Sequence, residues 1–139
     1  MRSWLACRTR GLSFCQLAPL LAVGMLVVTL LTSCAPQAGF KDVTVADLAA
    51  RDPGALVLDV REPWEYAEGH VPGSTLIPLA EVKARAAEVP ADRTVFVICR
   101  SGNRSAQASE ILAKAGKRDI RNVEGGMLAY QAAGYPVER

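Results

Sequence analysis

The segment from Cys99 to Ser105 combines a thiol with two arginines at short spacing, residue types that suit nucleophilic attack on an anionic substrate. An apolar, β-branched run at residues 94–98 precedes it, and a helical pattern follows. A loop between a strand and a helix can direct several backbone N–H groups at one anion. Gly102 supplies the conformational freedom for such a loop. We therefore expect the pKa of the Cys99 thiol to lie below its free value of about 8.5.

Arg100 and Arg104 add positive charge to this loop, and arginine can hold a tetrahedral oxyanion through paired N–H bonds. The opposing interpretation is a core cysteine at a strand end with two solvent-facing arginines, because cysteine is often buried for packing alone. The candidate catalytic residue is Cys99. The candidate substrate-binding residues are Arg100, Ser101, Gly102, Asn103, Arg104 and Ser105.

The first 33 residues have the pattern of an export signal. Three arginines and no acidic residue precede an uncharged apolar run at residues 20–31. This run is short for a bilayer span, which needs roughly 20 residues. We expect residues 1–33 to be a signal peptide; an uncleaved anchor is the alternative if residues 17–19 extend the run.

The cleavage region, Leu31-Thr32-Ser33-Cys34, resembles the lipobox of bacterial lipoproteins. The resemblance implies that the Cys34 thiol is diacylated, that the signal is cut before Cys34 and that the new amine is then acylated. Two or more acyl chains anchor a protein stably. The same resemblance implies that Ala35 after Cys34, where no aspartate stands, favours the outer membrane if the cell has two membranes. We expect an exported cell-envelope lipoprotein with a tether at residues 34–39 and one folded domain at residues 40–139. The alternative is an unmodified cysteine after an ordinary signal peptide.

Removal of the signal changes the charge and the thiol count. The whole chain has 16 basic and 14 acidic residues and a net charge of +2; without three signal-peptide arginines the net charge is about −1. This balance favours neither nucleic acid nor an anionic membrane surface as a partner. Cys7 and Cys15 leave with the signal and Cys34 is acylated, so Cys99 is the only thiol expected in the domain. That excludes a disulfide framework and a cysteine-based metal site.

The domain alternates strand and helix patterns. Apolar runs at residues 55–60 and 94–98 are typical of strands buried on both faces of a parallel sheet. Shorter strands are expected at residues 74–77 and 120–123. Helical patterns occur at residues 45–50, 79–89, 108–115 and 127–133. We predict an open α/β fold in which Asp59 and Cys99 lie at strand carboxyl ends, where ligands of such sheets bind.

Four motifs together resemble the single-domain rhodanese family. They are residues 58–62 (LDVRE), 68–74 (EGHVPGS), the loop 99–104 (CRSGNR) and residues 125–137, from GGM to GYPV. The resemblance covers residues 40–139 and implies a parallel sheet of about five strands flanked by helices. It also implies a sulfurtransferase that takes a sulfane sulfur from thiosulfate or a similar donor and passes it to cyanide or another thiophilic acceptor.

The resemblance assigns roles within the loop. Cys99 would form the persulfide, the backbone of residues 100–105 would cradle the sulfur and the substrate anion, Arg100 would attract the sulfonate, and Arg104 would brace the loop. No metal and no cofactor is implied. Cysteine phosphatases have the spacing Cys-x5-Arg, whereas Arg104 gives Cys-x4-Arg and Ser105 stands at the phosphatase position. A phosphatase is therefore the weaker alternative, and a noncatalytic binding or redox-sensing module is the other.

Asp59, Arg61 and Glu62 could form an acid–base set, but the resemblance favours structural support beneath the loop. His70 is the only histidine and could activate a cysteine. Its Gly-His-Val-Pro-Gly setting favours a packing role instead.

Trp64 and Tyr66 follow a predicted strand end. They are expected either to wall the binding pocket or to cover the surface.

Overall fold

The computed structural model describes residues 39–139 of the 139-residue chain. The predicted signal peptide, the lipidation residue Cys34 and the tether up to residue 38 lie outside the described residues. Within the described part, no helix has both the length and the apolar character to cross a membrane.

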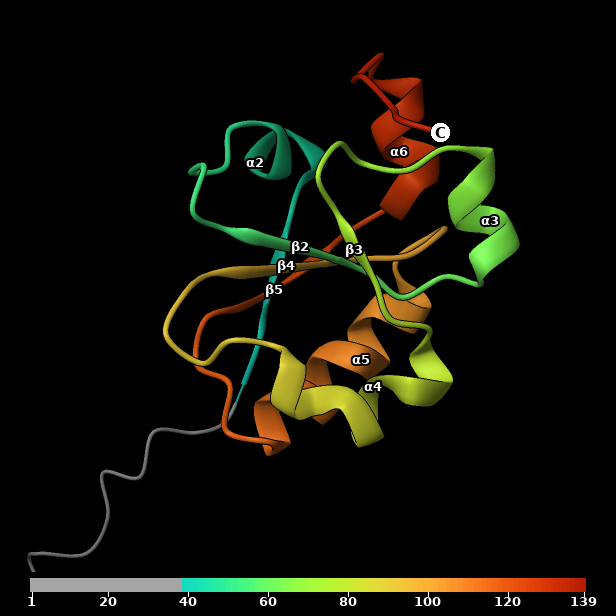
Figure 1. Ribbon diagram of the computed structural model, residues 1–139. Coiled ribbons are helices and arrows are strands. Elements are labelled where there is room, and N and C mark those ends of the chain that lie inside the picture. Colours follow the sequence, from blue (N-terminus) through green and yellow to red (C-terminus); the bar gives the residue numbers. More distant parts are fainter. Residues whose placement is uncertain (1–38) are drawn as a thin grey trace, which may run out of the picture. The chain divides into compact units, whose positions relative to one another are not determined.

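A five-stranded sheet, parallel throughout, forms the centre of the domain, with the strand order β1-β5-β4-β2-β3 (Figure 1). This confirms the predicted α/β fold. The strands are β1 (Lys41–Val43), β2 (Leu56–Asp59), β3 (Thr75–Leu76), β4 (Val95–Ile98) and β5 (Ile120–Val123). The sequence pattern predicted β2, β3, β4 and β5. Strand β1 was not predicted from the sequence.

In residues 39–139, six helical segments separate the strands or follow the last one. They are α2 (Val45–Ala49), α3 (Pro63–Glu68), α4 (Leu79–Arg85), the 3-10 turn η2 (Ala86–Glu88), α5 (Asn103–Lys114) and α6 (Gly126–Ala132). The pattern indicated all of them except α3. Helix α5 ends at Lys114, and Gly116 follows its C-cap with φ of +85°; the N–H of Lys117 donates to the carbonyl of Leu112 at 3.1 Å. This reverse turn stops the helix and directs the chain back into β5.

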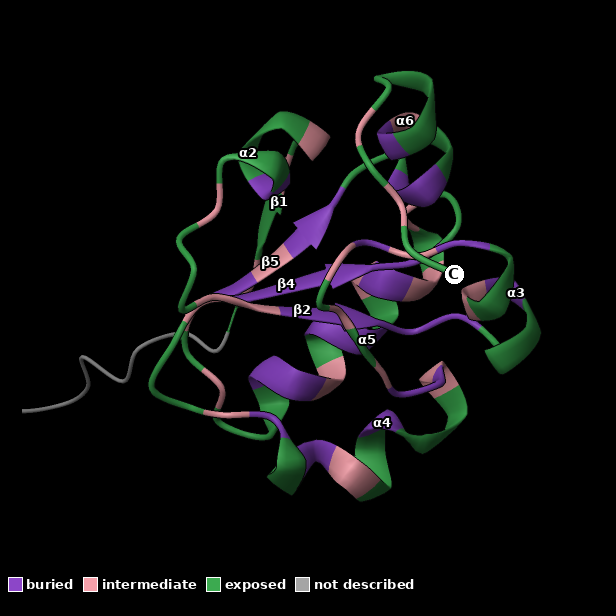
Figure 2. Cartoon of the chain, turned by 45° about the horizontal axis from the view of Figure 1, so that its top comes forward, coloured by how far each residue is buried: buried purple, intermediate pink, exposed green. Residues whose placement is uncertain are grey.

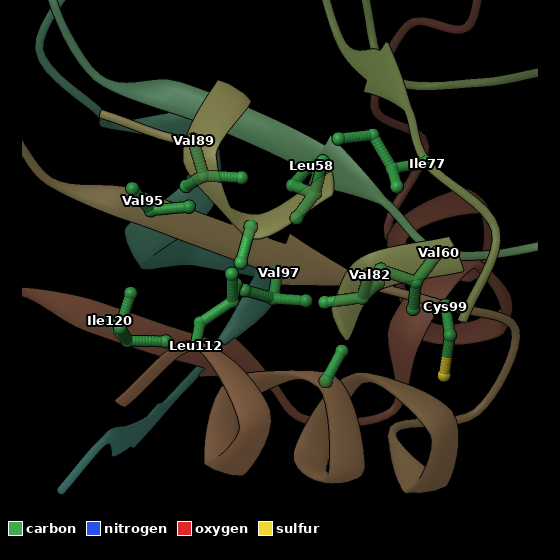
Figure 3. Close-up of a cluster of buried hydrophobic side chains, with 12 residues drawn as sticks. Leu58, Val60, Ile77, Val82, Val89, Val95, Val97, Cys99, Leu112 and Ile120 are labelled. Carbon is green, nitrogen blue, oxygen red and sulfur yellow. The ribbon is translucent and has the colours of Figure 1, made fainter. Parts of the chain in front are cut away.

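Helices cover both faces of the sheet. Figure 1 shows α4 and α5 on one face and α2 and α6 on the other. In β4, Val95 and Val97 pack with the α4–α5 side, whereas Phe96 and Ile98 pack with the α2–α6 side. Figure 2 shows the central strands as buried, and Figure 3 shows the α4–α5 cluster. Burial on both faces explains why the strands are continuous apolar runs rather than alternating ones.

The register of β2 and β4 places two predicted site residues at one edge of the sheet. Asp59 lies opposite Ile98, the residue before Cys99. The N–H of Val60 donates to the carbonyl of Ile98 at 2.9 Å, so the two strands stay paired up to their carboxyl ends. Helices α3, α5 and α6 follow strands β2, β4 and β5 from this same edge. The loops that can bind a ligand therefore converge there.

Candidate active site

The sulfur of Cys99 lies inside the loop that joins β4 to α5. Cys99 is 1% exposed, and its Sγ accepts a hydrogen bond from the backbone N–H of Gly102 at 3.1 Å. The hydroxyl of Ser105 donates to the same sulfur at 3.4 Å. Figure 3 shows Cys99 at one end of the apolar cluster, with its sulfur directed away from the other labelled side chains. The Cys99 side chain thus packs at the end of the apolar core, and its sulfur accepts hydrogen bonds from the loop.

The loop curls around the sulfur because of Gly102. This residue has φ of +105°, a left-handed conformation that other residues rarely adopt, and it caps the start of α5. The hydroxyl of Ser105 lies 2.9 Å from the carbonyl oxygen of Gly102 as well as near Sγ. Its single proton can therefore serve either acceptor, and a charged sulfur is the stronger one.

Two opposing effects set the pKa of the Cys99 thiol. Burial raises the pKa, because a buried thiolate loses its hydration. Hydrogen bonds from the Ser105 hydroxyl and from backbone N–H groups of Ser105, Gly102 and Ser101 lower it. The hydrogen bonds outweigh burial, and the pKa lies below its ordinary value, as the sequence pattern predicted. The loop therefore favours a thiolate, the nucleophilic form of cysteine.

The first residues of α6 form hydrogen bonds with the backbone of the Cys99 loop. The N–H of Met127 donates to the carbonyl of Cys99 at 2.8 Å, and the N–H of Leu128 donates to the carbonyl of Arg100 at 3.1 Å. These bonds require the helix to approach the loop backbone closely. A Cβ at Gly126 would lie 2.3 Å from the carbonyl oxygen of Cys99, so only glycine fits there. This gives a physical reason for the Gly-Gly pair in the fourth sequence motif.

The guanidinium group of Arg104 is held by a carboxylate from α3. Arg104 Nη1 and Nη2 donate to the two oxygens of Glu65 at 2.7 and 2.8 Å. This ion pair lowers the pKa of Glu65 to about 2; the desolvation of Glu65 opposes the shift, and the N–H of Glu62 assists it. Glu65 was not among the residues predicted for the site. Pro63 at the first helical position is a sequence signal for the start of α3, but no sequence signal indicates the pairing of Glu65 with Arg104.

The two loop arginines consequently differ in their surroundings. Arg104 forms an ion pair with Glu65, which links α5 to α3. Arg100 is exposed and has no ion pair within the described residues, so its charge can meet an anion. Ser101 and Asn103 are exposed at the rim of the loop.

A buried ion pair joins Arg61 to Asp59, the last residue of β2. Arg61 donates to both carboxylate oxygens of Asp59 at 2.7 to 3.0 Å, and its remaining N–H groups donate to the carbonyls of Glu65 and Gly69 at 2.9 Å. Both charged side chains are almost fully buried. These hydrogen bonds tie β2 to α3, and Arg61 also lines a pocket together with Trp64 and Arg100. The backbone N–H of Glu62 donates to the carboxylate of Glu65, and the side chain of Glu62 is exposed.

His70 has a structural environment. Its ring stacks on Tyr66 with centroids 3.7 Å apart, and its Nδ1 lies 3.0 Å from the carbonyl of Tyr66. Its backbone N–H and C=O pair with Glu138 at 2.9 Å each, which fastens the C-terminal segment. These contacts favour the packing interpretation over a Cys–His pair. Tyr66 also donates to the carbonyl of Ser74 at 2.7 Å and serves as cover.

A pocket of about 310 Å³ adjoins the loop. Its lining includes Trp64 from α3, Arg100 from the loop and Leu128 from α6. Of the two aromatics after β2, Trp64 is thus the one that walls a pocket. Among residues 39–139, no three His, Cys, Asp or Glu side chains gather where they could hold a metal ion.

Comparison with known proteins places this geometry in a family. The model of the rhodanese-like domain matches residues 35–133. A sulfurtransferase of Allochromatium vinosum is 38% identical over 82 residues, covering 59% of this chain and 77% of that protein. The thiosulfate sulfurtransferase PspE of Escherichia coli is 44% identical over 70 residues, covering 49% and 67%. The crystal structure of a rhodanese-related protein from Thermoplasma volcanium superposes with a TM-score of 0.67 at 39% identity, covering 70% of this chain and 97% of that one.

Proposed function

The chain belongs to the rhodanese-like domain family, and we propose that it is a sulfurtransferase in which Cys99 carries the sulfur as a persulfide. The observation that carries this proposal is the set of N–H and O–H donors gathered on Sγ, which lowers the pKa of the thiol. The same donors can hold the terminal sulfur of a persulfide, which is also an anion. Relatives named as sulfurtransferases support the reaction class.

The reaction proceeds in two displacements at sulfur. The Cys99 thiolate attacks the outer sulfur of thiosulfate, the S–S bond of thiosulfate breaks, and sulfite leaves with the bonding electron pair. A nucleophile such as cyanide then attacks the outer sulfur of the persulfide, forms thiocyanate and restores the thiolate. No proton has to move in either step, so neither His70 nor another general base is required. Exposed Arg100 attracts the donor anion.

The test follows both half-reactions in the full chain. We expect thiocyanate production from thiosulfate and cyanide, and a mass gain of one sulfur atom with thiosulfate alone. Cys99→Ser should lose both signals, because a hydroxyl at this position is not ionised. A folded wild-type sample that gains no sulfur from several donors would refute the enzyme and favour a binding or redox-sensing module. Sulfur transfer by Cys99→Ser would refute the nucleophile.

We propose further that the chain is exported and anchored through lipid on Cys34. This rests on the basic start, the short apolar run and the Leu-Thr-Ser-Cys sequence. In bacteria that make the protein, Cys34→Ala should block signal cleavage and acyl labelling, whereas Cys15→Ala should leave both unchanged. Normal processing and labelling of Cys34→Ala would overturn the anchor.

A further inference from the structure

The described chain enters the domain at the edge of the sheet that lies opposite Cys99. Because the strands are parallel and in register, β1, β2, β4 and β5 all begin at this edge. Cys99 follows the carboxyl end of β4, about 13 Å farther along for a strand of this length. Figure 1 shows the chain entering on the side of the loops that precede β4 and β5, away from α3. We call residues 39–41, 51–55, 89–94 and 117–119, which precede these strands, the entry edge.

The entry edge has an excess of positive charge. Two of its acidic residues, Asp52 and Asp92, form no ion pair within residues 39–139, and Asp119 is paired with Arg121. The basic side chains of this edge that form no ion pair in the same part of the chain are Lys41, Arg51, Arg93, Lys117 and Arg118. Three of them donate to backbone carbonyls, which are neutral and leave the positive charge uncompensated.

The edge that holds Cys99 does not share this excess. Its buried arginines, Arg61 and Arg104, are neutralised by the carboxylates of Asp59 and Glu65. The exposed side chains there without an ion pair in the described residues include three acidic ones against two basic ones, namely Glu62, Glu68, Glu124, Arg100 and Arg139. The nearly balanced net charge of the sequence therefore hides a separation of charge between the two edges of the sheet.

The proposed lipid anchor would keep the entry edge close to a bilayer. Five residue steps separate Cys34 from Gly39, and a chain of this length spans at most about 18 Å in any conformation. An anionic leaflet attracts basic side chains within about one Debye length, which is about 8 Å in physiological salt. The tether is thus short enough to hold the basic edge at a high local concentration beside the headgroups.

We propose that the entry edge docks on anionic phospholipid headgroups of the membrane that holds the anchor, so that Cys99 faces the aqueous compartment. The inference rests on the proposed anchor at Cys34 and adds an orientation to it. The basic side chains of the entry edge bind the lipid phosphates. Sulfur donors and acceptors then reach Cys99 from the water, and the persulfide is held away from the lipid.

The experiment locates each edge with a single tryptophan in the full chain, purified from bacterial membranes and placed in vesicles that contain a headgroup quencher. After signal cleavage Trp64 is the only tryptophan, and it lies at the Cys99 edge. Ala91→Trp combined with Trp64→Phe moves the single tryptophan to an exposed position of the entry edge. In phosphatidylcholine vesicles that also contain phosphatidylglycerol, we expect strong quenching of the entry-edge protein and weak quenching of Trp64. The difference should shrink in phosphatidylcholine alone and in about 1 M salt, which reduces the Debye length to about 3 Å.

Charge reversal tests the basic side chains themselves. In the entry-edge tryptophan protein, Arg93→Glu with Arg118→Glu reverses two charges of the docking surface. Arg100→Glu with Arg139→Glu makes the same change at the Cys99 edge and is the matched control. Each basic side chain near an anionic surface raises the docked population about fivefold, so the first pair should lower that population about 25-fold or more. The control pair should leave the quenching unchanged, and thermal unfolding checks that both proteins are folded.

The outcomes separate the docking from the anchor. Equal quenching of the two tryptophan positions in the anionic vesicles, or quenching that neither neutral lipid nor salt reduces, would overturn the docking and leave the anchor in place. This comparison needs no charge variant, so it decides even if a variant unfolds. A purified membrane protein without acyl chains would refute the anchor and the docking together. Persulfide formation at Cys99 tests the sulfurtransferase independently of both.

Discussion

The ion pair between Glu65 and Arg104 yields a stability prediction that depends on pH. Replacing Glu65 by glutamine keeps the size of the side chain and removes its charge. The change leaves Arg104 without its carboxylate partner and loosens the contact between α3 and α5. We expect Glu65→Gln to lower the free energy of unfolding at pH 7.

The pKa of Glu65 gives the magnitude. A shift from 4.5 to about 2 corresponds to an upper bound of about 3–4 kcal/mol at about 1.4 kcal/mol for each pKa unit. The Arg104 side chain is 31% exposed, and water screens its charge, so we expect about 2 kcal/mol. Because the folded-state pKa is lowered, this stability is complete above pH about 4.5 and is lost as the pH falls toward 2.

Urea unfolding of wild type and Glu65→Gln at pH 7 and pH 3 measures both effects. The difference between the two proteins should shrink by more than half at pH 3. Glu110→Gln is the matched control, because its ion pair with Lys114 is exposed on α5 and should matter far less. Equal losses in the two variants, or a Glu65→Gln loss that stays constant between pH 7 and pH 3, would refute the ion pair as the cause.

Three further predictions concern the loop and the core. Gly126→Ala should lower the free energy of unfolding by about 2–4 kcal/mol and slow persulfide formation, because the added methyl collides with the Cys99 carbonyl. In the control variant Gly54→Ala the added methyl meets no other atom, and the loss should stay below about 0.5 kcal/mol. Ser105→Ala should move the pH midpoint of Cys99 alkylation upward, since one hydrogen bond that lowers the pKa is lost; an unchanged midpoint would contradict its role. Leu112→Ala should cost about 2–5 kcal/mol in thermal or urea unfolding, and a smaller loss would mean that the core refills the cavity.

The fold was predictable where the sequence pattern is strong. The runs that became β2 and β4 are apolar and β-branched because helices cover both faces of these strands. Strand β1 was missed because Lys41 and Asp42 are exposed and the strand pairs with β5 alone, at the sheet edge. Helix α3 was missed because its six residues are too few to show a helical period.

The candidate site was predictable only within its own segment. The thiol, Gly102 and the arginines are adjacent in the sequence, and their chemistry can be inferred together. The partner of Arg104 lies 39 residues away on α3, and the pattern contains no information on that pairing. The same holds for Gly126, whose closeness to Cys99 exists only once β5 and α6 are in place.

The strand order also determines when the domain can fold during its synthesis. β1 pairs only with β5, whose residues come 80 positions later, and β4 joins the two halves of the sheet. A growing chain that ends before β4 holds only the short β2–β3 pair, and β1 has no neighbour. Parallel pairing over such distances closes long loops and is slow. The apolar strands therefore stay open to chaperones until nearly the whole domain has left the ribosome.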